Sequence, residues 1–226
     1  MPVTELATLH LKNNLPLDNP TNTHILSQLR SGLQAQAEYT NATTYLLTQI
    51  EDPNYIYILG QWDSVAQHVE EWIPSERNKA IMGGLADEVE VVGLEHLELG
   101  SLLPAKEEES DEGIPYEAAV VGIGRYFLSP LTKVGFARTF GATKHHLKEF
   151  QGPRRITGGW RVDKEVDDDG KEVEKEEFVL FSGWDTVQQH FSFAESNGFK
   201  EFGRIKHFMQ GAEIKHARWT FTALAQ

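Results

Sequence analysis

An internal repeat constrains this chain more than any other feature of its sequence. Residues 58–68 read ILGQWDSVAQH and residues 180–190 read LFSGWDTVQQH, so an apolar run, a Trp-Asp pair and a His recur at an offset of 122 residues. At a similar offset, the strand-like segment 91–99 (VVGLEHLEL) falls on the segment 214–221 (IKHARWTF). Self-similarity over half of a 226-residue chain predicts two copies of one supersecondary unit.

Each copy shows the order strand, helix, strand, strand, helix, strand. Period-two alternation marks the strands, and apolar residues at helical spacing mark the first helix, which Thr23 can cap. In the first copy we expect strands at 5–11, 44–50, 55–62 and 89–99, and helices at 23–38 and from Asp63 or Ser64 onward. In the second copy we expect strands at 118–128, 156–162, 177–183 and 214–221, and helices at 133–150 and from Asp185 onward.

The order βαββαβ predicts an α+β fold of two tandem ferredoxin-like units. In such a unit two helices cover one face of a four-stranded antiparallel sheet, and the other face needs a partner. We therefore expect the two sheets to pair face to face as one intramolecular α+β barrel. The predicted domains are a first repeat at 1–99, an acidic linker at 100–115 and a second repeat at 116–226. We expect the linker and the acidic hairpin at 163–177 to be exposed and mobile.

The acidic composition limits the partners of the chain. Its 34 acidic and 21 basic side chains give a formal net charge of -13, which repels nucleic acids and anionic lipid surfaces. The chain has no cysteine, which excludes disulfides and thiolate metal sites. It begins without the basic start and apolar run of a signal peptide. We expect a cytoplasmic protein, a monomer or weak homodimer, with a small-molecule ligand and without nucleic-acid or membrane partners.

The run YLLTQIEDPNYIYILGQWDSVAQHVEEW, residues 45–72, resembles the antibiotic-biosynthesis-monooxygenase-like (ABM) members of the dimeric α+β barrel superfamily. Those members show a strand, an acidic-Pro turn, a second strand ending in Trp plus an acidic residue, and then a helix. The segment FVLFSGWDTVQQHFSF repeats the pattern in the second copy. The resemblance implies cofactor-free oxygenation of polycyclic aromatic substrates, haem degradation, polyketide-type cyclisation, isomerisation or no known activity, so it leaves the chemistry open.

Haem-degrading members of this superfamily carry a helical Trp, a following His that ligates iron, and a strand Asn. Trp72 lies near the Trp position, but the stretches SERNKAIMG and SNGFKEFGR hold no His, and Ala7 stands nearest the Asn position. These departures weaken haem degradation most and oxygenation somewhat. We expect no cofactor, and no metal site either, because no His or carboxylate cluster has the spacing of metal ligands.

The alternation of the closing strands separates two faces of each sheet. Leu97 and Leu99 fall on Trp219 and Phe221, an apolar phase that we expect to face the helices. The other phase would point into the barrel and holds His96, Glu98, His216, Arg218 and Thr220, joined by Thr8 and His10 of the first strand. Buried polar groups are bonded to one another, to water or to a ligand. This phase is therefore the candidate site, unless these side chains emerge into solvent at the barrel rim.

These residues suggest a small-molecule enzyme that acts on an aromatic or polyketide-like compound as a cofactor-free monooxygenase or cyclase. His96 or His216 would be the acid or base, because imidazole titrates near neutral pH. Arg218 would hold a developing oxyanion, and His10, Tyr57 and Trp72 would contact the substrate. Two alternatives stay open: a non-catalytic ligand-binding or stress-associated barrel, and a structural protein with a filled interior.

The residues that recur in both copies favour a structural interpretation. Trp62, Asp63 and His68 have counterparts 122 residues later, and a feature kept in both halves of a duplication serves the shared fold more often than catalysis. We interpret them as a Trp packed at a strand end, an Asp that caps a helix, and a His on the helix side. A paired functional role is the alternative.

Overall fold

The computed structural model describes residues 1–99, 113–163 and 175–225 of the chain. These residues fall into two compact units. Unit 1 holds Met1–Glu98 and Ala217–Gln226, and unit 2 holds Leu99–His216. Most of the two acidic runs, at 100–112 and 164–174, lies outside the described residues, so their predicted mobility stays a prediction.

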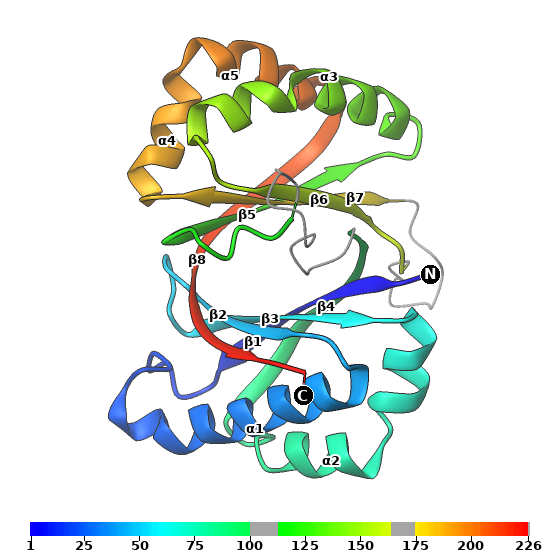
Figure 1. Cartoon of the computed structure of the whole chain (residues 1–226), viewed down its shortest axis with the longest axis vertical. Coiled ribbons are helices and arrows are strands. Elements are labelled where there is room, and N and C mark those ends of the chain that lie inside the picture. Colours follow the sequence, from blue (N-terminus) through cyan, green and yellow to red (C-terminus); the bar gives the residue numbers. More distant parts are fainter. Residues whose placement is uncertain (100–112, 164–174, 226) are drawn as a thin grey trace. The chain divides into compact units, whose positions relative to one another are not determined.

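Unit 1 follows the predicted order of strands and helices. Its sheet has the strand order β4-β1-β3-β2, and each neighbouring pair is antiparallel. Helices α1 and α2 cover one face of this sheet (Figure 1). The elements are β1 (Val3–Leu11), the 3-10 turn η1 (Pro20–Asn22), α1 (Thr23–Thr40), β2 (Thr44–Gln49), β3 (Tyr55–Trp62), the π-helix η2 (Gln67–Trp72), α2 (Glu76–Gly83) and β4 (Val89–Glu98).

Unit 2 repeats this order with more helical pieces before its last strand. Strand β7 pairs with β5 and with β6, both antiparallel, and α3, α4 and α5 cover one face of the sheet (Figure 1). The elements are β5 (Val120–Leu128), α3 (Lys133–Gln151), β6 (Ile156–Arg161), β7 (Glu176–Trp184), α4 (Val187–Glu195), α5 (Asn197–Phe202), the 3-10 helix η3 (Gly203–Phe208) and β8 (Met209–Ala223). From Ala217 onward β8 belongs to unit 1, where it pairs with β2.

The helical segment after the repeated Trp-Asp pair begins at the same cap in both units. In unit 1 the hydroxyl of Ser64 accepts a hydrogen bond from the N–H of Gln67, whose side chain accepts one from the N–H of Asp63. Thr186 and Gln189 repeat this arrangement in unit 2. The hydroxyl residue, rather than the repeated Asp, therefore caps the helix in the manner of a capping box.

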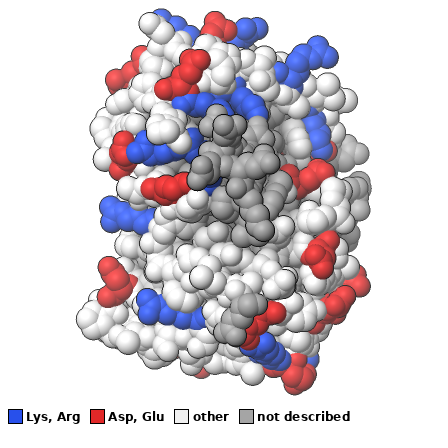
Figure 2. Space-filling model, viewed as in Figure 1, with Lys and Arg blue, Asp and Glu red and all other residues white. Residues whose placement is uncertain are grey.

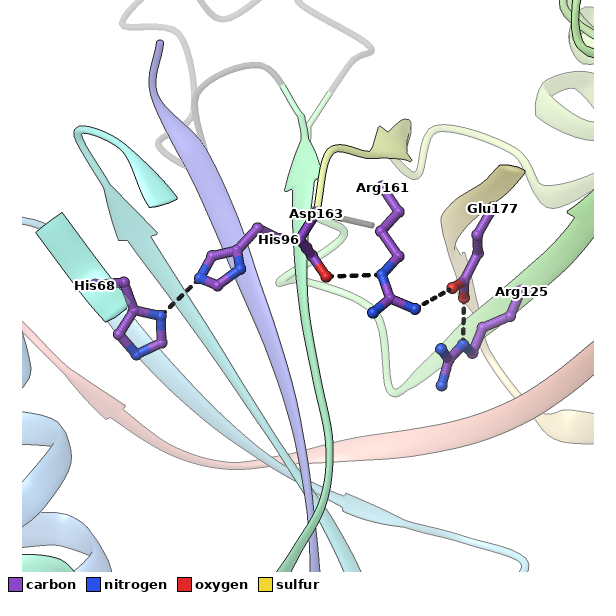
Figure 3. A network of polar contacts seen from close by, with 6 residues as sticks. All are labelled: His68, His96, Arg125, Arg161, Asp163 and Glu177. Carbon is purple, nitrogen blue, oxygen red and sulfur yellow. Dashed lines mark hydrogen bonds and ion pairs between the residues drawn. The ribbon is translucent and has the colours of Figure 1, made fainter. Parts of the chain in front are cut away.

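Three expectations about local structure are wrong. Thr23 does not cap α1 but is its first residue, and it follows the turn η1, whose N-cap is Asn19. Ile114, in the predicted exposed linker, is buried. Glu177, at the end of the acidic hairpin, is also buried, and its charge is compensated by ion pairs with Arg125 and Arg161 (Figure 3).

The two units fill the space between sheet and helices with different side chains. In unit 1 the core is aliphatic and includes Leu9, Ile25 and Leu33. In unit 2 it is aromatic, with the ring of Phe136 against those of Tyr126 and Phe178. The surface mixes acidic and basic side chains over the face shown in Figure 2. Among the described residues, no helix is long and apolar enough to cross a membrane.

Candidate functional site

A cavity of about 290 Å³ lies between the sheet and the helices of unit 1. Its walls are mostly apolar side chains from β1, α1, α2 and β4. These include Ala7, Leu9, Leu29, Leu33, Ile81, Met82, Val91 and Leu94. Its few polar lining residues include Glu5, Gln36 and His68, and Trp72 also lines it. A mainly apolar cavity with a few convergent polar groups is the usual form of a small-molecule site.

Glu5 of β1 is the acidic residue that lines this cavity, and it is only 5% exposed. Its Oε2 accepts hydrogen bonds from Nε1 of Trp62 at 2.9 Å and from Nε2 of Gln36 at 2.7 Å. Burial raises the pKa of the Glu5 carboxyl above its ordinary value, while these two hydrogen bonds and the charge of His96 act in the opposite direction. Both donors engage the same carboxylate oxygen, Oε2.

His68 stands beside Glu5 and is held by two neighbours. Its ring stacks on Trp62, with ring centres 4.1 Å apart and planes 8° apart. Its Nδ1 lies 2.8 Å from Nε2 of His96 on β4 (Figure 3). Its Nε2 lies 3.9 Å from Oε2 of Glu5. Burial, followed by the nearby His96, lowers the pKa of His68 to about 3. His68 is therefore a neutral imidazole at physiological pH.

The π-helix η2 supplies both His68 and Trp72 to the site. It begins just after the Ser64 cap, and the N–H of Ile73 bonds to the carbonyl of His68, five residues back. A single widened turn of this kind re-aims the side chains around it, and such turns occur often at functional sites. The matching segment of unit 2 is an ordinary α-helix, α4.

Unit 2 keeps the same Trp–His–His arrangement. The rings of Trp184 and His190 stack with centres 4.2 Å apart, and Nδ1 of His190 lies 2.8 Å from Nε2 of His216. The partner of the Trp nitrogen differs, because Nε1 of Trp184 donates to the hydroxyl of Ser182 at 2.9 Å.

In each unit the hydrogen-bond partner of the Trp nitrogen lies on one strand and a glycine lies opposite it on the paired strand, and the two units place them on opposite strands. Glu5 faces Gly60 across β1 and β3, and Gly122 faces Ser182 across β5 and β7. A Cβ on Gly60 would meet Nε2 of Gln36 and Oε2 of Glu5. A Cβ on Gly122 would instead meet Oγ of Ser182 and Nε1 of Trp184. Each glycine makes room for the side chain on the paired strand. A side chain at Gly60 would therefore clash while Glu5 is present, and a side chain at Gly122 would clash while Ser182 is present.

Aromatic rings pack unit 2 where unit 1 has its cavity wall. Tyr126 occupies the β5 position that matches Leu9 of β1, and its ring lies against Phe136 of α3. A Cβ on Gly124 would come within 2.9 Å of the Tyr126 hydroxyl oxygen. The Gly122-Ile123-Gly124 segment therefore makes room for packing on the helix side of the sheet.

The predicted phase of the closing strands is wrong for both histidines. His96 pairs with Glu5 and contacts His68 of η2, so it lies on the face covered by the helices. His216 contacts His190 of α4 in the same way. The register of β1 and β4 shifts between Thr8 and Leu9, and such an irregularity reverses the faces of the residues beyond it.

A second register shift splits the predicted apolar pair. Phe221 packs against the helix-side core of unit 1, as expected, and lies under the guanidinium of Arg30. Trp219 instead pairs with Leu47 and rests against Tyr45 on the opposite face, because the register of β2 and β8 shifts between Leu46 and Leu47.

The remaining predicted substrate contacts are scattered. Trp72 lines the cavity. Tyr57 lies on the other face of the sheet, where its hydroxyl accepts a hydrogen bond from Gln49. His10 also lies away from the helices, with its ring against Tyr55, and Arg218 is exposed. Of the predicted substrate-binding residues, the structure brings one to the cavity.

Sequence reasoning missed Glu5 and Gln36. The signal for Glu5 was present, because it shares the alternation phase of Ala7, Leu9 and Leu11, which are apolar. A lone carboxyl in an apolar phase is costly to bury without partners. No comparable signal marks Gln36, whose role depends on where α1 crosses the sheet.

The donor groups of the unit 1 cavity do not fit a haem iron. Nδ1 of His68 faces His96, its Nε2 faces Glu5, and its ring is stacked on Trp62, so no ring nitrogen is directed at an open coordination position. Within the described ranges, no group of three or more His, Cys, Asp or Glu side chains is arranged to hold a metal ion.

Known structures share this fold over nearly the whole chain. An anthrone oxidase-like protein is 13% identical with a TM-score of 0.68, and the match covers 99% of this chain and 93% of that one. A candidate monooxygenase from Fusobacterium nucleatum is 10% identical with a TM-score of 0.62, over 99% and 94% of the two chains. A candidate chlorite dismutase is 10% identical with a TM-score of 0.58, over 97% and 95%.

These structural neighbours are of the dimeric α+β barrel type, in agreement with the resemblance found in the sequence. At such low identity the likeness shows the fold alone. No protein-family model matches the sequence, and no curated protein matches it. The chemistry has to come from the residues of the cavity.

Proposed function

We propose that this chain is a monooxygenase-like enzyme that oxidises an uncharged aromatic compound in the unit 1 cavity, without a bound cofactor. We further propose that its two units are tandem ferredoxin-like repeats whose sheets pair face to face. The observation that carries the enzymatic proposal is Glu5, a buried carboxyl that lines a mainly apolar cavity. The names of two structural neighbours, an anthrone oxidase-like protein and a candidate monooxygenase, support this class of reaction.

The chemistry requires a base in an apolar setting. A carboxylate that has lost its water shell is a stronger base than one in solvent, and burial raises the pKa of Glu5 in this sense. It can take a proton from a carbon beside a carbonyl group. The carbanion that forms can reduce dioxygen, which gives a hydroperoxide once the peroxide oxygen regains a proton. Loss of water from the hydroperoxide then leaves a new carbonyl, so that one CH₂ and one O₂ become one C=O and one H₂O.

The walls of the cavity select the ligand. No lysine or arginine is among the described residues that line it, so an anion would find no counter-charge there. Aliphatic side chains from α1, α2 and β1 would contact the ring faces, and Trp72 would contact a ring edge or face. The volume of about 290 Å³ suits a compact ring system rather than a long chain.

The first test is the oxidation of anthrone, a tricyclic ketone with an acidic methylene group. The purified protein should accelerate both oxygen uptake and anthraquinone formation above the spontaneous rate. Glu5→Gln keeps the side-chain volume and removes the base, so it should lower the turnover rate by about 10²- to 10⁴-fold. Glu90→Gln changes an exposed carboxyl of β4 and should leave the turnover rate unchanged.

A binding measurement separates the enzyme from a ligand-binding protein. Calorimetric titration with anthraquinone under the same conditions reports occupancy without turnover. If ligands of this shape bind while Glu5→Gln has no effect on oxygen uptake, the enzymatic proposal is wrong and the non-catalytic alternative holds. If neither binding nor turnover occurs with a panel of uncharged ring systems, both proposals fail.

A further inference from the structure

Three titratable side chains form a row that begins at the cavity. Glu5 lines the cavity, His68 lies next with its Nε2 3.9 Å from Oε2 of Glu5, and His96 follows with its Nε2 2.8 Å from Nδ1 of His68. All three are buried, at 5%, 4% and 2% exposure. They come from β1, η2 and β4, so the fold has brought together groups that are far apart in the sequence.

A buried carboxyl can act as a base only if another group accepts its proton. In an apolar cavity the neutral acid is favoured over the carboxylate, since no solvent stabilises the charge. Neither Trp62 nor Gln36 can accept that proton, because both use an N–H to donate to Glu5. The imidazole of His68 can accept it, and the ring of His96 can accept a proton in turn from His68.

We propose that His68 and His96 prepare Glu5 for its role as a base by carrying its proton away to His96. This inference rests on the proposed function of Glu5. The carboxyl proton moves to Nε2 of His68 while the proton on Nδ1 of His68 moves to Nε2 of His96. The pair Glu5 acid and neutral His96 becomes Glu5 carboxylate and His96 imidazolium, and His68 ends as the other neutral tautomer. His68 mediates the transfer, and His96 is a positioning residue that holds the countercharge.

The geometry and the electrostatics agree with this division of roles. A cationic His68 is strongly disfavoured, as its pKa of about 3 shows, so a transfer that keeps it neutral throughout is the accessible one. The charge of His96 acts to lower the pKa of Glu5. The 3.9 Å gap between Glu5 and His68 exceeds a hydrogen bond and closes through a small shift of the carboxyl or one bridging water.

Other polar groups also face the row. Trp62 of β3 and Gln36 of α1 donate to Glu5, and Asn78 of α2 adds a further polar group to the cavity lining. Among the described residues that line the cavity, Glu5 and His68 are the titratable ones. His96 of β4 does not line the cavity but contacts His68.

Unit 2 provides the matched control. His190 and His216 keep the same 2.8 Å contact, but Gly122 stands where Glu5 stands in unit 1. At this position the pair therefore lies beside a glycine instead of a carboxyl. His96→Phe and His216→Phe therefore remove equivalent rings from equivalent strands, and only the first should affect a carboxyl.

The test measures the ionisation of Glu5 directly. Infrared spectra recorded across a pH titration show the carbonyl band of a protonated carboxyl, and the band that Glu5→Gln removes belongs to Glu5. In His96→Phe the midpoint of this band should move to higher pH by about one pH unit or more. In His216→Phe it should stay where it is in the wild type. Unchanged circular dichroism and melting temperature would verify that both variants fold.

Turnover supplies a second readout with its own meaning. The rising limb of the pH profile for kcat/KM should shift with the infrared midpoint in His96→Phe, and activity should recover at high pH. A uniform loss at every pH with an unmoved midpoint, or an equal shift in His216→Phe, would overturn the proposal. If the midpoint shifts but the wild type does not oxidise anthrone, the coupling of His96 to Glu5 stands and the proposed reaction is wrong. Should His96→Phe fail to fold, His96→Gln is measured in its place.

Discussion

Units 1 and 2 hold a Trp, a helix His and a strand His in the same geometry, but the surroundings of the three residues differ. In unit 1 a cavity of about 290 Å³ and the buried carboxyl of Glu5 lie next to them. In unit 2 Gly122 takes the place of the acid, and the rings of Tyr126 and Phe136 pack on the same side of the sheet. The part that the two units share cannot account for a property of one unit alone, so a function specific to unit 1 is best sought in the part that differs.

The largest expected effect is the loss of stability in acid that results from burial of His68 in unit 1. The pKa of His68 is about 3 in the folded chain, against an ordinary value of 6.5. Below pH 6.5 the unfolded chain binds a proton that the folded chain does not. The free energy of unfolding should therefore fall as the pH drops from 6.5 toward 3, by up to about 5 kcal/mol.

His68→Gln should remove that contribution and flatten the pH dependence. Urea titrations at pH 7 and pH 4 would measure it. His145→Gln, at an exposed position of α3, serves as the control and should keep the full acid loss. An acid loss as large in His68→Gln as in the wild type would show that burial of this imidazole is not what makes unit 1 sensitive to acid.

The packed core of unit 2 should be less tolerant than the wall of the unit 1 cavity. Phe136 is fully buried among rings, so Phe136→Ala should lower the free energy of unfolding by about 3 to 5 kcal/mol. Ile81 lines the cavity and is partly exposed, so Ile81→Ala should cost about 1 kcal/mol. Chemical denaturation measures both, and similar costs would contradict the contrast drawn here between a filled and an open site.

The reciprocal glycines permit a transplant of the unit 2 arrangement into unit 1. Gly60→Ser alone would set its Cβ 2.2 Å from Nε2 of Gln36 and should be destabilising. Combined with Glu5→Gly, the new hydroxyl can accept the Trp62 N–H, as Ser182 does for Trp184. A double-mutant cycle should then show a favourable coupling of about 1 to 3 kcal/mol. Additive effects would mean that the two strands do not compensate each other.

The smallest effect on stability should come from filling the cavity. Ala7 lines it, so Ala7→Val should change the free energy of unfolding by less than about 1 kcal/mol while weakening the binding of ring compounds. Gly124 occupies the matching position of unit 2, where a Cβ would lie 2.9 Å from the Tyr126 hydroxyl oxygen. Gly124→Ala should therefore cost stability and spare ligand binding. Calorimetry on both variants decides, and unaltered ligand affinity in Ala7→Val would place the binding site elsewhere.

Most of the element order was predictable because alternation and repeat agree along the chain. The strand Tyr55–Trp62 matches its predicted bounds, and α1 begins at Thr23, the first residue of its predicted range. The repeated Trp62 and His68 keep the same stacked geometry as Trp184 and His190 in unit 2. The position of His68 next to a carboxyl was not predictable, because it depends on a contact between side chains of β1 and η2 that are far apart in the sequence.

The faces of the closing strands could not be read from alternation alone. A register shift beside Gly93 carries His96 to the helix side, and the Cβ-free Gly93 leaves space for such an irregularity. The second shift, at Leu46 and Leu47, separates Trp219 from Phe221. Neither shift is marked in the sequence by a turn motif or a proline. His96 and His216 were consequently assigned to the wrong face of the sheet.

The strand β8 has a consequence for how the chain is made. Its last residues pair with β2 of unit 1, so Phe221 joins Leu46 only after the whole of unit 2 has been synthesised. Until then the β2 edge of the nascent sheet carries unpaired backbone groups, which can recruit strands of other chains. The sheet of unit 1 can therefore be completed only after unit 2 has been synthesised. A chain interrupted before residue 217 would leave the β2 edge without this partner strand.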